Sequence, residues 1–315
     1  MLNAHSIVFI HIGTSFPEHV THSISQARLF NKECPIYLIA YGSTLAKEFS
    51  KFAEFSVTPV PCESLQLSEH HLKFRNCKSH NFTANGFWVY TSERFFYLDD
   101  FVRQYNLSDV FHLENDVMLY TDLSDHLSSF QKYYKGMIGA TFENDTRCVP
   151  GFVYISNSKP LGHLVDSFPD CVLPDTSEMA TIAKFKDSNL NVYIDYLPVV
   201  PSQYIDDHKL ELSKVSKEFK LYSNHFEDFA SVFDAAAFGV YLGGWDSYAH
   251  PETGEPGQIS PHSNFNASYF DITWKIDGEG RRIPFITYKG KQTRINNLHI
   301  TNKVRIPAFH SLYKN

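Results

Sequence analysis

The sequence predicts an α/β protein whose mainly parallel sheet is covered by helices on both faces, with an elaboration at its C-terminal end. In the first half of the 315-residue chain, short apolar runs alternate with longer segments of helical spacing. Residues 7–12 and 36–40 are apolar at nearly every position. Such runs are typical of parallel strands buried on both faces, and the alternation is typical of helical crossovers between them. The chain is 43% hydrophobic, which is enough for a full core.

The expected elements can be placed in chain order. Strands are expected at 7–12, 36–40, 56–60, 110–113, 117–120, 137–140, 151–155 and 192–194. Helices are expected at 15–31 and 44–52, from 87 to about 105, from Ser177 onward, and at 232–242. Residues 61–86 are polar without clear periodicity and are expected to form a long connection, and 245–315 a turn-rich region with short strands. No clean linker is evident, so one domain, 1–315, is expected.

Composition excludes several classes of protein. The formal charge is -7 and there is no long basic run, which argues against non-specific nucleic-acid binding. No stretch of about 18 apolar residues is present, so no membrane span is expected. No signal peptide is evident. The five cysteines are odd in number and lack a CxxC pair, which favours a reduced compartment. A cytoplasmic location is therefore expected, with peripheral attachment to a membrane left open.

The most informative segment is 111–118, Phe-His-Leu-Glu-Asn-Asp-Val-Met. Glu114 and Asp116 follow an apolar run and are two residues apart, so on an extended chain their side chains point to the same side. Mg²⁺ and Mn²⁺ prefer carboxylate oxygens and accept phosphate as a further ligand. The pair therefore indicates a metal site at a strand end, although an acidic pair alone more often only solvates such an end.

A second candidate site is the end of the first strand. His11, Gly13 and Thr14 lie where ligands bind in open α/β sheets, outside the carboxyl ends of the strands. Gly13 would allow a ligand to approach the backbone closely. An ordinary strand-to-helix turn explains the same residues equally well.

The order of these motifs resembles the GT-A glycosyltransferases, and in layout the family of glycogenin and the bacterial lipopolysaccharide galactosyltransferases. The resemblance covers about 7–303. It implies that Glu114-Asn115-Asp116 corresponds to the DxD motif, in which Asp116 binds the metal, Glu114 binds it or faces the ribose, and Asn115 lies at the donor. It implies that His299 completes the metal site and that Lys303 contacts the diphosphate.

The resemblance also implies roles for residues outside the acidic motif. Arg94, on the helix before the motif, corresponds to an arginine that reaches the donor, and Glu178 to an acid near the donor sugar. A surface ion pair and a favourable charge at a helix N-terminus are the competing explanations for these two residues. The late motif differs from the family's, since no Gly or Trp accompanies His299 and Lys303. The exact family therefore stays open.

The segment Gly243-Gly244-Trp245-Asp246 is a candidate for the acceptor site. The Trp245 indole could cover a sugar face, and Asp246 could act as a base or bind hydroxyl groups. A helix end with a packed tryptophan is the simpler interpretation. The resemblance assigns 1–160 to the donor and metal, and 161–315 to the acceptor side and the return to the metal site.

The predicted function is a metal-dependent glycosyltransferase, of the hexosyltransferase class, that uses Mn²⁺ or Mg²⁺. A nucleotide-sugar donor is expected, with a UDP-sugar favoured, and a glycan or glycolipid as acceptor. Two alternatives remain. A nucleotidyltransferase would need a Gly-rich loop bearing Lys or Arg after the first strand, and His11 to Ser15 has one Gly and no nearby Lys. A non-catalytic carbohydrate-binding protein on the same scaffold would bind neither metal nor donor.

Overall fold

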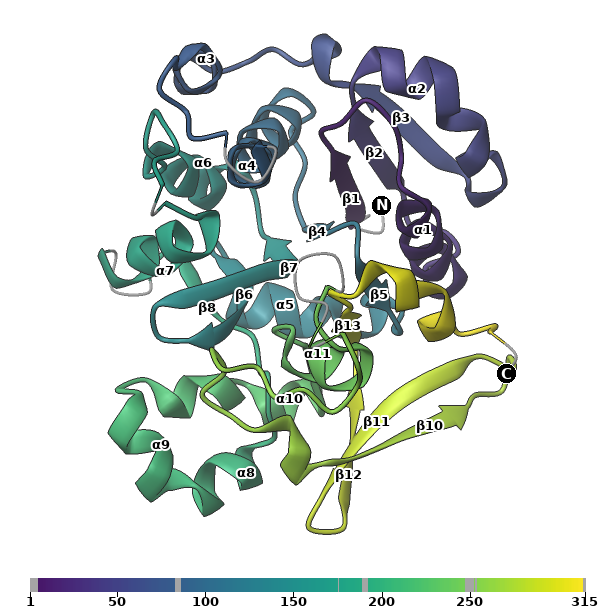
Figure 1. Cartoon of the computed structure of the whole chain (residues 1–315), viewed down its shortest axis with the longest axis vertical. Helices are drawn as coiled ribbons and strands as arrows, with labels where there is room; N and C mark the ends of the chain where they lie inside the picture. Colours follow the sequence, from purple (N-terminus) through teal and green to yellow (C-terminus); the bar gives the residue numbers. More distant parts are fainter. Residues whose placement is uncertain are drawn as a thin grey trace.

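A seven-stranded sheet in the order β3-β2-β1-β4-β7-β6-β8 forms the centre of the computed structural model (Figure 1). The structure describes residues 5–82, 86–174, 176–188, 192–246, 252 and 254–313. β1–β2, β2–β3, β1–β4 and β6–β8 pair in parallel, whereas β7 is antiparallel to both β4 and β6. The predicted class, a mainly parallel sheet flanked by helices, is confirmed.

The strands of this sheet are buried on both faces, as their composition predicts. Within β1, Val8 and Ile10 pack into one hydrophobic cluster, while Ile7 and Phe9 pack into a second cluster on the other face. The strands are β1 (Ser6–His11), β2 (Ile36–Ala40), β3 (Val57–Pro61), β4 (Val110–Leu113), β6 (Ile138–Asn144), β7 (Arg147–Ile155) and β8 (Ile194–Tyr196).

Helices cover the two faces of the sheet. Most buried apolar residues of α1 (Glu18–Phe30), and those of α2 (Gly42–Glu48) and α5 (Leu127–Tyr133), belong to the cluster that contains Phe9. Those of α4 (Phe87–Gln104), α6 (Ser158–Asp166) and α7 (Glu178–Ser188) belong to the cluster that contains Val8. Each helix therefore buries one apolar side against the sheet.

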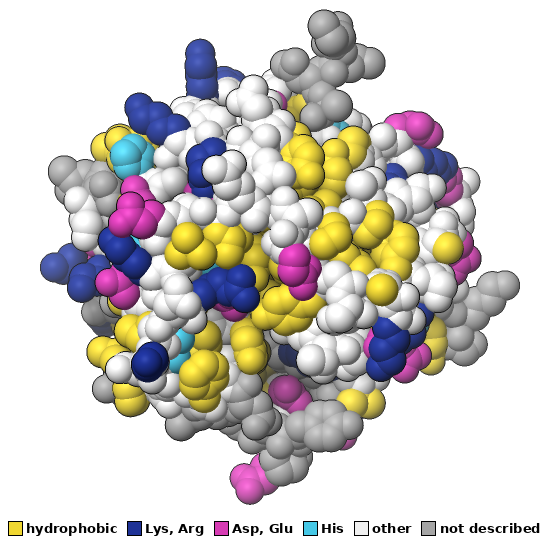
Figure 2. Space-filling view, turned by 90° about the horizontal axis from the view of Figure 1, so that it is seen from above, with side chains coloured by type: hydrophobic (Ala, Val, Ile, Leu, Met, Phe, Trp, Pro, Cys, Tyr) yellow, Lys and Arg dark blue, Asp and Glu magenta, His cyan; other side chains and the backbone are white. Residues whose placement is uncertain are grey.

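The connection expected at 61–86 contains a helix, so its assignment as an irregular loop was wrong. This helix is α3 (Glu69–Asn76). It is capped by Ser68, whose side chain accepts a hydrogen bond from the backbone N–H of His71. Tertiary packing against α4 stabilises this polar segment. α3 and α4 lie at the top of Figure 1 and expose Leu72, Phe87 and Tyr90. Figure 2 shows hydrophobic side chains gathered across the middle of this upper face.

The second half of the chain differs from the prediction in detail. The expected helix at 232–242 is split into β9 (Ser231–Val232) and α11 (Ala237–Gly243). The turn-rich C-terminal region supplies three strands that pair with β9 in a four-stranded sheet, in the order β10-β11-β12-β9. Its other strands are β10 (Asp271–Ile276), β11 (Arg282–Tyr288) and β12 (Lys291–Ile295), and further helices are α8 (Ser202–Asp207), α9 (Lys209–Val215) and α10 (Phe226–Phe229). Alternation in these amphipathic strands is weak, which is why the sequence alone did not separate them.

The cysteines also differ from the prediction. Cys77 and Cys171 form a disulfide with Cα atoms 5.8 Å apart, so the expectation of a wholly reduced set of cysteines was wrong. Cys34, Cys62 and Cys148 are free and buried. The two paired cysteines are 94 residues apart, a separation from which pairing cannot be deduced. The disulfide removes the cysteine argument for a cytoplasmic location. Among the described residues, none of the helices is both long and apolar enough to cross a membrane.

A small two-stranded sheet places a segment from the C-terminal part of the chain beside the segment that follows the acidic motif. β5 (Val117–Leu119) pairs antiparallel with β13 (Asn297–His299), and Val117 lies opposite His299. This pairing places the C-terminal segment beside the turn that carries the two acids of the central motif.

Candidate active site

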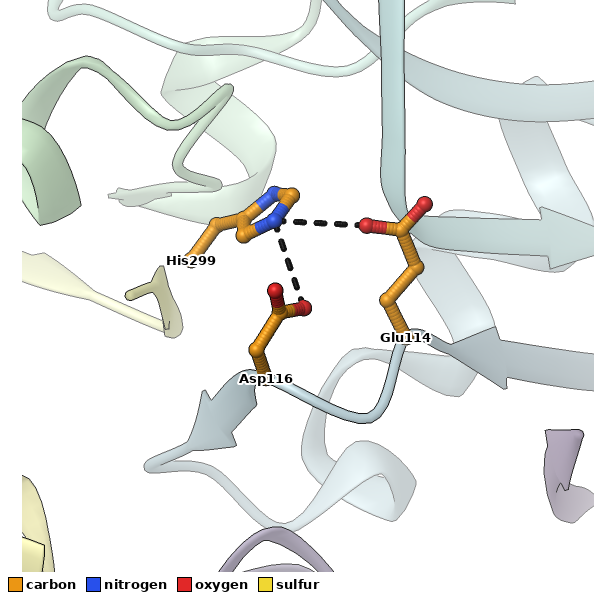
Figure 3. Close-up of side chains that lie close together, drawn as sticks. All are labelled: Glu114, Asp116 and His299. Atoms are coloured by element: carbon orange, nitrogen blue, oxygen red, sulfur yellow. Dashed lines mark ion pairs between the residues drawn. The ribbon is translucent and has the colours of Figure 1, made fainter. Parts of the chain in front are cut away.

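The two acids of the central motif lie in the tight turn between β4 and β5. The backbone N–H of Val117 donates to the carbonyl of Glu114 over 3.1 Å, and the N–H of Glu114 donates to the carbonyl of Gly151 on β7 over 2.9 Å. These bonds fix the turn to the sheet. Both acidic side chains then point to the same side of the turn, as Figure 3 shows.

His299 completes a cluster with the two acids. Its Nε2 atom lies 3.3 Å from Glu114 Oε2 and 3.3 Å from Asp116 Oδ1 (Figure 3). One ligand atom from each of the three residues can be chosen so that all lie within 4.8 Å of one another. Asp116 and His299 are 8% and 7% exposed. Two carboxylates and one imidazole in this arrangement fit the ligand preferences of Mn²⁺, which accepts nitrogen more readily than Mg²⁺ does.

Lys303 lies beside the cluster, at the start of a 3-10 helix that spans Lys303–Phe309. Its Nζ atom is 2.8 Å from Asp116 Oδ2. Although burial disfavours the charged ammonium group, Asp116 raises the pKa of Lys303. Burial likewise disfavours a charged His299, but Asp116 and Glu114 raise its pKa to about 9. The pKa of Asp116 is well below its usual range, because the charges of Lys303 and His299 outweigh its burial.

Arg94 connects the metal-site candidates to Glu178. On one side Arg94 Nη2 forms an ion pair with Glu114, and on the other it lies 3.4 Å from Glu178 Oε1. The second carboxylate oxygen of Glu178 accepts a hydrogen bond of 2.9 Å from Thr91 Oγ1. Burial raises the pKa of Glu178, which is 3% exposed. Neither residue is therefore an isolated surface charge.

The charges of this site balance one another. Three acids lie among three cationic side chains, namely Glu114, Asp116 and Glu178 with Arg94, His299 and Lys303. A cation that binds here would have to displace the proton from His299, because a ligating imidazole must be neutral, and would compete with Lys303 for Asp116.

The end of β1 meets the same turn through Asn115. Asn115 Nδ2 donates to the carbonyl of Ile10 over 3.0 Å and lies 3.5 Å from His11 Nδ1. Within the described residues, the buried Oδ1 atom of Asn115 has no hydrogen-bond partner. The Gly13 carbonyl accepts from the hydroxyl of Thr44, and Thr14 is exposed. Asn115 thus faces the first strand, while the acids on either side of it face His299.

The segment after α11 approaches the site from the other direction. Asp116 and, to a smaller extent, the charge of Asp246 raise the pKa of Lys303 against its burial. Thr301 donates to the carbonyl of Gly244 over 3.0 Å, which joins the end of α11 to the strand that follows His299. Trp245 is half-buried and packs against the core. A purely structural role for this tryptophan fits these contacts as well as an acceptor role does.

Three residues near the site were missed by the sequence analysis. Thr91 binds Glu178 and Asp234 binds the backbone of His299. Burial lowers the pKa of His19 on α1 to about 4, against the opposing charge of Asp116. The position of Thr91 three residues before Arg94 was a usable signal, since such residues share a helix face. Nothing in the sequence indicated Asp234 or His19, because their contacts depend on the tertiary fold.

Comparison with known proteins shows similarity to solved structures, and no similarity at the level of sequence families. No protein-family model matches the chain, and neither does any curated protein. Mouse xyloside xylosyltransferase 1 has a TM-score of 0.46 at 10% identity, over 69% of this chain and 93% of that one. The galactosyltransferase LgtC, in complex with donor and acceptor sugar analogues, has a TM-score of 0.40 at 9% identity, over 70% and 83%. A cytidylyltransferase from Leptospira borgpetersenii has a TM-score of 0.39 at 13% identity, over 62% and 76%. Because every one of these TM-scores is below 0.5, the function is inferred from the site itself.

Proposed function

We propose that this protein is a metal-dependent glycosyltransferase that moves a sugar from a nucleotide-sugar donor to a hydroxyl group of its acceptor. The observation that carries the proposal is the meeting of Glu114, Asp116 and His299, two of which are more than 180 residues apart in sequence. Gathering two acids around a histidine in a largely buried position is costly in free energy, since the charged groups lose their contact with water. Their convergence at the carboxyl end of β4 fits a ligand site better than a structural one.

Glu114, Asp116 and His299 would hold the divalent cation. When bound, Mn²⁺ or Mg²⁺ would act as a Lewis acid toward the diphosphate that leaves the donor. Lys303 places an ammonium group beside Asp116 and would bind the same phosphates, because an ammonium group is a strong donor to phosphate oxygens. If Asp116 held the cation, its ion pair with Lys303 would be weakened and the Lys303 ammonium group would be free to bind the phosphates.

Arg94 and Glu178 would line the side of the donor sugar. Arg94 is held between Glu114 and Glu178, so its guanidinium group keeps a fixed orientation. Glu178 is buried and its pKa is raised, and these are properties of acids that act on a substrate as well as of structural acids. We assign Glu178 to the donor sugar, where its carboxylate would order hydroxyl groups or stabilise positive charge that develops at the anomeric carbon.

The nucleotide would occupy the ends of β1 and β4. His11, Gly13 and Thr14 border this position, and the unpaired Oδ1 atom of Asn115 is an acceptor for a donor group of the ligand. A UDP-sugar is the donor we favour. The acceptor, a glycan or glycolipid, would approach Trp245 and Asp246. This division assigns 1–160 to donor and metal and 161–315 to the acceptor within one domain.

The test is a thermal-shift screen of nucleotides and nucleotide sugars, with and without Mn²⁺, followed by measurement of donor hydrolysis. A ligand at 100 times its Kd stabilises the folded protein by about 2.7 kcal/mol. We expect one nucleoside diphosphate to raise Tm in the presence of Mn²⁺ and its sugar conjugate to be hydrolysed slowly. If nucleoside triphosphates and sugar phosphates bind instead, and pyrophosphate is released, the protein is a nucleotidyltransferase. Binding of free sugars without metal or nucleotide would indicate a carbohydrate-binding protein.

A further inference from the structure

The buried carboxylate of Asp234 joins His299 to a helix. Asp234 is 0% exposed and lies between β9 and α11. Its Oδ1 atom accepts from the N–H of Phe238 over 2.9 Å, and its Oδ2 atom accepts from the N–H of Gly239 over 2.8 Å. The same Oδ2 atom accepts from the N–H of His299 over 3.1 Å. One side chain therefore fixes the backbone of His299 to the first turn of α11.

Two glycines fit closely against His299. A Cβ atom on Gly239 would overlap the carbonyl oxygen of His299, and a Cβ atom on Gly151 would lie only 2.6 Å from its Nδ1 atom. Gly239 thus lets α11 approach the backbone of His299, while Gly151 on β7 leaves room for its ring. The backbone and the imidazole of His299 are therefore restrained by two different elements.

The second ring nitrogen of His299 is unusual for a metal ligand. A ligating histidine commonly donates its other N–H to a carboxylate, carbonyl or water, and this hydrogen bond orients the ring. In His299 the Nε2 atom faces Glu114 and Asp116, and the buried Nδ1 atom has no hydrogen-bond partner among the described residues. The orientation of this ring is set without that bond.

We propose that Asp234 is a positioning residue for the metal site, and that with Gly151 and Gly239 it replaces the missing hydrogen bond at Nδ1. Asp234 holds the His299 backbone, and the two glycines allow the close packing that aims Nε2 at the acids. Asp234 touches neither Glu114 nor Asp116, so its effect would pass through His299 alone. This inference rests on the proposed function, because it concerns how the metal is held.

The experiment compares Mn²⁺ binding by the wild type, Asp234→Asn and Gly151→Ala, measured by electron paramagnetic resonance of the free ion. Asp234→Asn leaves one amide oxygen for three N–H donors and sets an NH2 group against a backbone N–H in either orientation, so the anchor of His299 is weakened. Gly151→Ala removes no hydrogen bond and displaces only the ring. Loss of such supporting contacts typically weakens metal binding about 10- to 100-fold, and we expect a Kd increase in this range for both variants.

Asp145→Asn is the matched control. Asp145 also accepts three hydrogen bonds, from Ser216 Oγ, Tyr222 OH and the N–H of Lys217, but none of them comes from the metal site. We expect it to lower Tm without changing the Kd for Mn²⁺. If the wild type binds Mn²⁺ and both site variants bind it equally well, the positioning role is wrong. If the wild type itself binds no Mn²⁺, the proposed metal-dependent function fails instead.

Discussion

At the scale of single residues, Asp116 is the group on which the proposed metal site depends most. It contacts both His299 and Lys303 and is almost fully buried. Asp116→Asn keeps the size of the side chain but removes its charge. We expect turnover to fall on the order of 100-fold or more, because a hard cation then loses an anionic ligand.

The direct measurement for Asp116→Asn is Tm with and without Mn²⁺. The ion should stabilise the wild type, and this stabilisation should disappear in the variant. Asp122→Asn is a suitable control, because the Asp122 side chain accepts its hydrogen bonds from the nearby Ser124 at the start of a 3-10 helix and not from the metal site. A folded Asp116→Asn protein with normal Mn²⁺ dependence would exclude Asp116 as a ligand.

Lys303 makes a separate prediction about the nucleotide. Its ammonium group is beside Asp116, where the phosphates would lie, and its side chain is 35% exposed. Lys303→Ala should weaken UDP binding about 10- to 100-fold and leave uridine binding unchanged, since a hydrogen bond to a charged group contributes about 1.5–3 kcal/mol. Isothermal titration of both ligands measures the difference. Lys32→Ala, which removes an exposed lysine paired with Glu279, controls for loss of positive charge. Equal losses for UDP and uridine would contradict a phosphate contact.

At the scale of elements, the docking of α3 on α4 depends on a buried histidine. His71 is fully buried, with Nδ1 2.6 Å from Asp100 Oδ2 and Nε2 3.6 Å from Glu93 Oε1. Burial disfavours the charged ring, but the two acids raise the pKa of His71 above its ordinary value of 6.5. The group therefore stabilises the fold fully below pH 6.5, and this contribution is lost as the pH rises through the folded-state pKa.

His71→Gln should accordingly destabilise the protein by about 2–4 kcal/mol at pH 6, because one partner of a buried ion pair is removed. The difference from the wild type should shrink at pH 9. Denaturant unfolding at the two pH values measures this difference in the free energy of unfolding. His22→Gln, at a partly exposed position on α1, controls for the loss of a histidine. A difference of the same size at both pH values would show that His71 acts through packing alone.

At the scale of the whole molecule, the disulfide is a covalent link between two distant parts of the chain. Cys77 follows α3, and Cys171 precedes α7, which begins with Glu178. A cross-link over 94 residues restricts the unfolded chain, and its loss typically costs about 2–4 kcal/mol. Cys77→Ser should therefore lower Tm, and a thiol reductant should lower the Tm of the wild type by a similar amount. An unchanged Tm under both conditions would mean that this bond adds no stability.

The central sheet could be predicted from the sequence because its signal is local. Continuous apolar runs such as 7–12 and 36–40 are typical of parallel strands buried on both faces, and both runs form such strands here. The acidic pair was detectable because it directly follows an apolar run. Its side chains share a side through the tight turn between β4 and β5, and not through the extended strand that the sequence suggested. The prediction for 61–86 failed because α3 has little hydrophobic periodicity of its own and is stabilised by contacts with α4.

The sequence by itself determined the α/β class, the order of the buried strands along the chain and the identity of the acids at the end of β4. Only the tertiary structure decided which distant residues join them. The pairing of β13 with β5 places His299 against the acids, and Asp234 and Gly239 hold it there. The disulfide between Cys77 and Cys171 was decided in the same way. Local patterns depend on neighbours along the chain, whereas these contacts depend on packing and long-range pairing, which leave no periodic signal.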